Sequence, residues 1–167
     1  TKEVQHLTYL DVRMLDTPSL GLVQSERQIL FMAASVGEMM THLRSCLEEG
    51  PEQVVLEQAI FKGEQALDNV QKEVFVYLSR LVSGQVPHDV TAMAHAQMRL
   101  ADEYESLSDY VTNVLKAYKK MKNAELDLDG PARERLLSLH DRVATYIATV
   151  GAYVADNSKD VLPLAQS

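Results

Sequence analysis

The sequence predicts an all-α protein, built as an elongated up-down antiparallel bundle of four long helices. Apolar residues recur with alternating spacings of four and three along most of the chain, which is typical of helices that pack through heptad seams. Glycine and proline occur where these periodic stretches end. No stretch shows the sustained period-two alternation of a strand. We therefore expect helices at about 18–49, 51–83, 87–124 and 131–156, crossing at about 20°.

The first helix is expected to follow a linker. Residues 1–17 lack helical periodicity and are predicted to form a linker or arm, and residues 18–167 to form the bundle. Thr17 is suited to the N-cap and Pro18 to the first helical turn. The predicted inner seam of this helix comprises Leu22, Glu26, Ile29, Ala33, Val36, Met40, Leu43 and Leu47.

The next two helices repeat the pattern. Gly50-Pro51 separates the first helix from the second, and Ser83-Gly84 and Pro87 separate the second from the third. The second seam comprises Leu56, Ile60, Gly63, Leu67, Val70, Val74, Tyr77 and Leu81. The third comprises Met93, Gln97, Leu100, Tyr104, Leu107, Val111, Val114, Tyr118 and Met121.

The fourth helix is expected to begin after a turn at Asp127–Pro131. Its inner stripe comprises Leu136, His140, Val143, Ile147, Val150 and Val154, widened by Leu137, Ala144 and Gly151. His140 stands alone among apolar residues, so we expect it to be a hydrogen-bonded interior histidine.

Composition and charge exclude several classes of protein. The net charge of −8 argues against nucleic acid as a partner. The single Cys46 excludes an internal disulfide. No apolar run approaches the roughly 18 residues of a membrane span, so this stretch of chain is expected to be soluble. The chain begins at Thr1 rather than Met, so we expect it to be an excerpt of a longer protein.

Acidic residues on the third helix form the main candidate site. Asp102, Glu105 and Asp109 are spaced by three and four, and the predicted seam places them on the opposite, solvent-facing side, together with His95 and Met98. Glu64 and Asp68 form a similar pair on the second helix. Carboxylates in this pattern either bind a hard metal ion or form an ordinary solvated helix face, and spacing leaves both open.

Known catalytic patterns are absent from the sequence. A ferritin-like di-iron centre needs two Glu-x-x-His motifs, and the chain contains none. There is also no glycine-rich phosphate loop and no Gly-x-Ser-x-Gly. We therefore expect no catalytic residues, no bound cofactor other than metal, and a helical interaction module rather than an enzyme. A carboxylate-bundle metalloenzyme is the remaining catalytic alternative.

The segment Leu100–Val114 resembles the signature helix of PhoU-like proteins. That pattern has an acidic residue, an apolar residue, Glu-Arg-Ile-Gly-Asp, and an asparagine four positions later. Glu103, Glu105, Asp109 and Asn113 match it, whereas Ser106 and Ser108 replace the arginine and the glycine. The segment Lys72–Pro87 is similar to the second helix of that family and its turn into the third.

The first residues of the chain indicate which members of the PhoU-like family it resembles most. Tyr9-Leu10-Asp11, Leu15-x-Thr17-Pro18, Leu20-x-Leu22 and Gln24-x-x-Arg27 resemble the linker into the PhoU-like domain of bacterial sodium/phosphate cotransporters. The resemblance implies an upstream membrane transporter domain in the same polypeptide and a place on the cytoplasmic side of the inner membrane. It also implies one three-helix repeat plus the first helix of a second. A bundle of that kind is expected to expose apolar edges, so a homodimer is a candidate assembly.

The resemblance also implies a function. PhoU-like proteins bind iron or zinc through Glu/Asp-x-x-x-Asp motifs on the outer face, and Glu105 and Asp109 fit that motif. The expected role is a non-catalytic regulatory or interaction domain of a sodium-dependent phosphate transporter, with metal on Glu105, Asp109, Asp102, Glu64 and Asp68. The alternative is a stand-alone PhoU-type metal-binding regulator of phosphate uptake and signalling.

Overall fold

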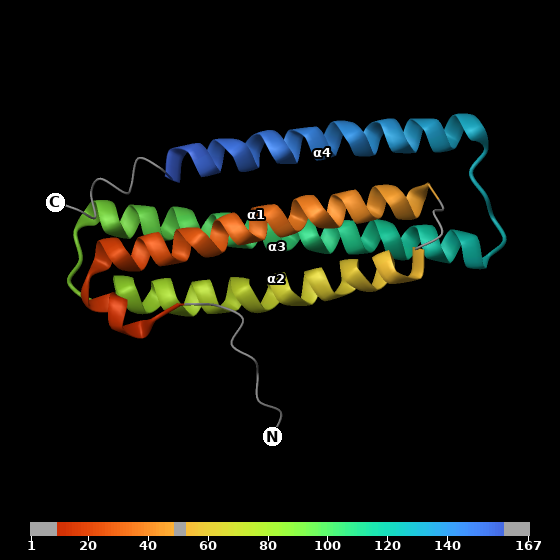
Figure 1. The fold of residues 1–167 in the computed structure, drawn as a ribbon. Coiled ribbons are helices and arrows are strands. Elements are labelled where there is room, and N and C mark those ends of the chain that lie inside the picture. The colour runs from red at the N-terminus through yellow and green to blue at the C-terminus, as the bar shows by residue number, and fades with distance from the viewer. Residues whose placement is uncertain (1–9, 49–52, 159–167) are drawn as a thin grey trace, which may run out of the picture.

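The protein consists of four long helices, as seen in a computed structural model that describes residues 10–48 and 53–158 (Figure 1). A short 3₁₀ helix, η1 (Val12–Asp16), precedes α1 (Pro18–Leu47), α2 (Gln53–Val82), α3 (His88–Asn123) and α4 (Gly130–Ser158). The described residues contain no strand, so the all-α prediction is confirmed. The expected turn at Gly50-Pro51 and the last residues of the predicted bundle lie outside the described ranges.

Successive helices run in opposite directions, but the four helices do not pack equally. The helices α1, α2 and α3 pack against one another, whereas α4 lies along α1 (Figure 1). At about 1.5 Å per residue, the 36 residues of α3 span about 54 Å, so the molecule is elongated. The architecture is therefore a three-helix core with a fourth helix on its surface.

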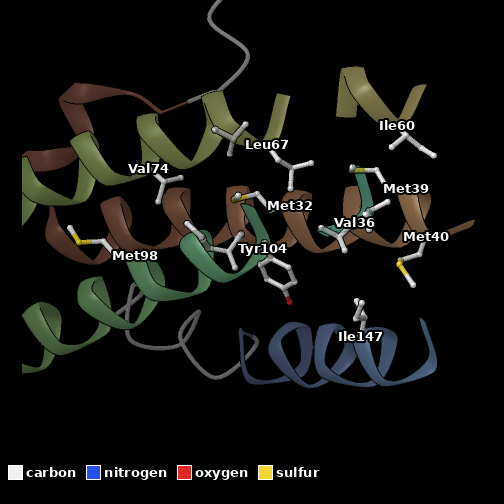
Figure 2. Close-up of a cluster of buried hydrophobic side chains, with 14 of the residues drawn as sticks. Met32, Val36, Met39, Met40, Ile60, Leu67, Val74, Met98, Tyr104 and Ile147 are labelled. Carbon is white, nitrogen blue, oxygen red and sulfur yellow. The ribbon is translucent and has the colours of Figure 1, made fainter. Parts of the chain in front are cut away.

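The core is a continuous layer of aliphatic and methionine side chains between the helices (Figure 2). The residues that α2 contributes to the core belong to its predicted seam. They are Ile60, Leu67, Val70, Val74, Tyr77 and Leu81, all of which are buried. The seam of α1 is wider than predicted, because this helix contacts the other three. Met32, Met39 and Cys46 are buried there in addition to the expected Leu22, Ile29, Val36, Met40, Leu43 and Leu47. Glu26 and Ala33 of the predicted seam are only half-buried.

The third helix is rotated relative to the prediction. Its buried face is centred on Ala101, Tyr104, Ser108 and Leu115, whereas Val114 of the predicted seam is 41% exposed. The prediction that Met98 faces solvent is wrong, since this side chain is only 8% exposed. Small side chains provide the physical reason, because fully buried alanine and serine allow a helix to approach its neighbours closely. The small residues at this interface are Ala94, Ala101 and Ser108.

The described end of the predicted linker is docked on the core. Leu10 and Leu15 pack partly buried against it. The backbone N–H of Asp11 donates to Oε1 of Gln24 at 3.0 Å. The Tyr77 hydroxyl lies 3.2 Å from the same oxygen and 3.4 Å from the Asp11 carbonyl. These contacts hold η1 at the end of the bundle where α1 begins and α2 ends.

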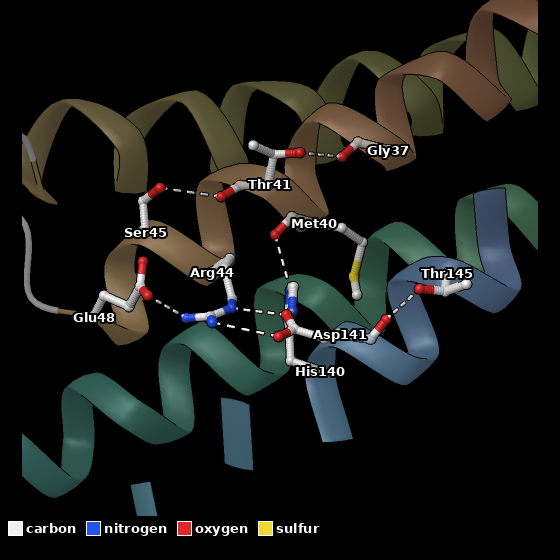
Figure 3. Close-up of polar contacts among 9 residues, drawn as sticks. All are labelled: Gly37, Met40, Thr41, Arg44, Ser45, Glu48, His140, Asp141 and Thr145. Atoms are coloured by element: carbon white, nitrogen blue, oxygen red, sulfur yellow. Dashed lines mark hydrogen bonds and ion pairs between the residues drawn. The ribbon is translucent and has the colours of Figure 1, made fainter. Parts of the chain in front are cut away.

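Polar contacts attach α4 to α1 (Figure 3). Nε of Arg44 donates to Asp141 at 2.7 Å, and the same guanidinium pairs with Glu48 at 2.6 Å. Nε2 of His140 lies 2.9 Å from the Met40 carbonyl oxygen, so the expectation of a hydrogen-bonded interior histidine is confirmed. Ile147 adds a buried apolar contact (Figure 2). Within the described ranges, none of the helices has the length and apolar character needed to cross a membrane.

Candidate functional site

The five predicted carboxylates lie around one interface, between α2 and α3. Glu64 and Asp68 come from α2, and Asp102, Glu105 and Asp109 come from α3. Burial raises the pKa of the Glu105 carboxyl above its ordinary value of 4.5, and the charges of the other four carboxylates raise it further. We call these five residues the acidic cluster.

Glu105 lies at the centre of the acidic cluster. It is half-buried, as are Glu64 and Asp68, whereas Asp102 and Asp109 are exposed. The prediction that all three α3 carboxylates face away from the core is therefore wrong for Glu105. The rotation of α3 moves this residue to the side of the helix that flanks α2. Sequence spacing placed the exposed Asp102 and Asp109 correctly, and it misplaced only Glu105 on the helix surface.

Two members of the acidic cluster are paired with neighbouring side chains. Nζ of Lys72 lies 2.7 Å from Oδ2 of Asp68, one helical turn away on α2. Nε2 of Gln71 donates to Oδ1 of Asp102 at 3.3 Å, which links α2 to α3. Among the described residues, no hydrogen bond or ion pair reaches the carboxylates of Glu64, Glu105 or Asp109. The cluster therefore keeps an excess of negative charge.

Buried hydroxyl groups hold the backbone beneath the cluster. The Ser108 hydroxyl donates to the Glu105 carbonyl at 2.7 Å, and the Thr112 hydroxyl donates to the Asp109 carbonyl at 2.9 Å. Both side chains are almost fully buried against the core. Their polar atoms are thus satisfied inside the helix itself. Ser108 stands where the PhoU-like pattern has glycine, and it fills that position without leaving an unpaired hydroxyl.

The chemistry of the acidic cluster suits a hard cation, since all its donors are carboxylate oxygens. In the described part of the chain, no three His, Cys, Asp or Glu side chains are arranged to hold one metal ion. Ligation would therefore require new rotamers of the exposed Asp102 and Asp109. Both residues lie inside α3, so such a change can be made by their side chains.

A shallow hollow of about 770 Å³ continues from the acidic cluster along α2 and α3. Its apolar lining includes Phe75 and Met98, and its polar lining includes Lys72, His95 and Arg99. The spacing on the third helix singled out His95 and Met98, but nothing in the sequence linked them to residues of α2. The acidic cluster is thus bordered by a cationic, partly apolar surface.

The ion pair that joins α1 to α4 was not predicted. Arg44 and Asp141 are 97 positions apart, and both look like ordinary surface residues in the sequence. The one available signal was His140, whose place in an apolar stripe did indicate a contact with another helix.

Comparison of the chain with protein families, with curated proteins and with solved structures gave no match.

Proposed function

We propose that the protein is a non-catalytic regulatory domain of the PhoU-like type, which acts on a sodium-dependent phosphate transporter. The acidic cluster is the observation that carries this proposal. The resemblance rests on a signature helix with Glu105 and Asp109, and both residues belong to one interfacial group of carboxylates. In this proposal the domain adjoins a membrane transporter domain on the cytoplasmic side of the inner membrane.

The proposed activity of the acidic cluster is divalent cation binding. Glu105 and Asp109 would provide the primary oxygen ligands from α3, and Glu64 and Asp68 would complete the site from α2. Asp102 would contribute from the adjacent turn. A bound iron, zinc or other divalent ion would neutralise the repulsion that raises the pKa of Glu105. The ion would thereby stabilise the contact of α2 with α3 and would link metal availability to the state of the domain.

Calorimetric titration with Mn²⁺, Fe²⁺ and Zn²⁺ tests this activity. We expect one site on the wild-type chain and at least a tenfold loss of affinity in the Glu105→Gln/Asp109→Asn variant, because two of the ligands lose their charge. The matched control is Glu38→Gln/Glu134→Gln, which removes two exposed carboxylates on α1 and α4. Absence of binding to the wild-type chain, or an equal loss in both variants, contradicts the metal site.

The transporter assignment has a separate test. The gene sequence upstream of residue 1 should encode membrane-spanning segments in the same reading frame. A reading frame that begins near residue 1 contradicts the tethered domain and favours a stand-alone PhoU-type regulator of phosphate uptake and signalling. Metal binding by the acidic cluster is compatible with both, so the two tests are independent.

A further inference from the structure

A second apolar seam runs along α4, beside the one that packs on α1. The residues toward α1 are His140, Ala144, Ile147 and Gly151. One position away, large apolar residues are spaced by three and four along the helix, and several are strongly exposed: Leu139 (56%), Val143 (42%), Tyr146 (71%) and Tyr153 (70%). We call Leu136, Leu139, Val143, Tyr146, Val150 and Tyr153 the outer seam. A heptad seam of this kind is complementary to another helix.

The outer seam is one wall of an apolar groove. Leu136, Leu139 and Val143 face Leu107, Tyr110 and Val114 of α3 across a cavity of about 180 Å³, with α1 as its floor. Tyr110 and Val114 are 67% and 41% exposed. This exposure follows from the rotation of α3, which turns its predicted seam toward α4 without closing the gap.

The outer seam is complementary to itself when two copies run antiparallel. Pairing Val143 with Tyr146 of a second copy sets a register in which Leu139 meets Val150, and Leu136 meets Tyr153. Each of these pairs then occurs twice around a two-fold axis. A tyrosine thus meets an aliphatic side chain in two of the three kinds of layer, and leucine meets valine in the third.

Charges beside the outer seam fit the same register. Arg135 and Asp156 lie on the flank of the seam near opposite ends of α4. In the antiparallel arrangement, Arg135 of one copy comes beside Asp156 of the other, at both ends of the interface. Arg142 comes beside Thr149, so no like charges meet. Opposite charges at flanking positions select partner and orientation in helix pairs.

We propose that the protein forms a two-fold dimer through an antiparallel pair of α4 helices, with the outer seams in contact and α3 residues Tyr110 and Val114 at the edge. None of the interface residues belongs to the acidic cluster, so the inference does not depend on metal binding. The expected occupant of the groove is therefore a second copy of this chain.

Sedimentation equilibrium of the full chain at several concentrations tests the dimer. We expect a reversible dimer, weakened by about tenfold or more in Tyr146→Glu, because the substitution puts a charge in the middle of the apolar layer. The control Phe75→Glu changes an exposed aromatic residue on α2 and should leave the dimer unchanged. Circular dichroism should show wild-type helicity in both variants. A chain that stays monomeric, or a dimer that only Phe75→Glu weakens, overturns the proposal.

Charge reversal tests the register. Arg135→Asp and Asp156→Arg should each weaken the dimer, and the double variant should restore most of the lost affinity. Failure of the double variant to recover any affinity, with helicity intact, overturns the antiparallel register.

Discussion

At the residue scale, the electrostatics of Glu105 connect the fold with the proposed site. The carboxyl is half-buried and has four acidic neighbours, which together raise its pKa above 4.5. The folded chain therefore holds the Glu105 proton more tightly than the unfolded chain does. Stability from this residue is lost as the pH rises from 4.5 through the raised pKa, and at neutral pH the ionised carboxylate opposes folding.

Replacing Glu105 by glutamine should stabilise the protein at pH 7. We expect a gain of about a few tenths of a kcal/mol, since like charges one turn apart cost that much and solvent screens them. Urea unfolding measures the change, with the exposed Glu38→Gln as control. The gain should disappear below pH 4.5, where the wild-type carboxyl is protonated. A loss of stability in Glu105→Gln at pH 7 would show that the ionised group is favourably paired.

The pKa of Asp141 is shifted in the opposite direction to that of Glu105. Hydrogen bonds from Arg44 and then from His140 lower its pKa below 3.8. Its contribution is therefore present above pH 3.8 and is lost as the pH falls through the lowered pKa of the folded state. The Asp141→Asn variant should expose α4 amides to faster hydrogen exchange at pH 7 and leave α2 unchanged. Equal rates in variant and wild type would mean that apolar contacts alone hold α4.

At the element scale, the helices differ in how well their sequence predicts their packing. The seam of α2 is buried as predicted, because this helix packs on two neighbours that lie on the same side. The seam of α3 is buried only in part. Its residues Gln97, Tyr104, Val111 and Tyr118 are buried as predicted. At the intervening positions the small residues Ala94, Ala101 and Ser108 are buried instead of the larger residues of the predicted seam. The periodicity of apolar residues predicts which face of a helix is buried. It does not predict how closely the backbones of two helices approach.

Replacing two glycines of α1 by alanine should have opposite effects on stability. A Cβ at Gly37 would meet no atom within 4 Å, whereas a Cβ at Gly21 would lie 2.4 Å from Cδ1 of the buried Leu81. Gly37→Ala should therefore stabilise the protein by about 0.5–1 kcal/mol through helix propensity. Gly21→Ala should destabilise it by about 1–3 kcal/mol through overpacking. Thermal unfolding of the two variants measures both effects. Effects of the same sign would contradict the close packing of α1 on α2 at Gly21.

The packing of α4 mainly on one other helix predicts faster hydrogen exchange of its amides. This helix packs mainly on α1, whereas the other three share the central core. Amides of α4 should therefore exchange through a local opening that costs less free energy than opening of α1, α2 and α3. In the proposed dimer the protection of α4 should rise with protein concentration, since α4 then lies between two copies. Concentration-independent exchange in α4 would argue against its place in a dimer interface.

At the scale of the whole molecule, the sequence was sufficient for the fold class, the helices and the residues of the acidic cluster. The sequence was not sufficient to predict that α4 packs mainly on α1. This packing depends on which face each helix turns toward each neighbour. A single sequence does not show that two distant surface residues such as Arg44 and Asp141 form an ion pair. Glu105 and Asp109 were singled out because their spacing is local, whereas the electrostatic effect of Asp68 on Glu105 is seen only in three dimensions.

The molecule thus offers two surfaces that share no residue. The acidic cluster lies on α2 and α3, and the outer seam lies on α4 next to α3. A regulatory domain with both could respond to a cation at one surface and assemble through the other. The central claim is that the five carboxylates act together as a cation site.

The most direct measurement of that claim is the titration of the Glu105 side chain, followed by NMR of its ¹³Cδ resonance with and without Zn²⁺. Our account predicts a midpoint above 4.5 in the metal-free chain and a fall in that midpoint when the ion is added. The Glu38 resonance, from an exposed residue outside the cluster, should not respond to the ion. A Glu105 midpoint at or below 4.5 that Zn²⁺ leaves unchanged would contradict the account.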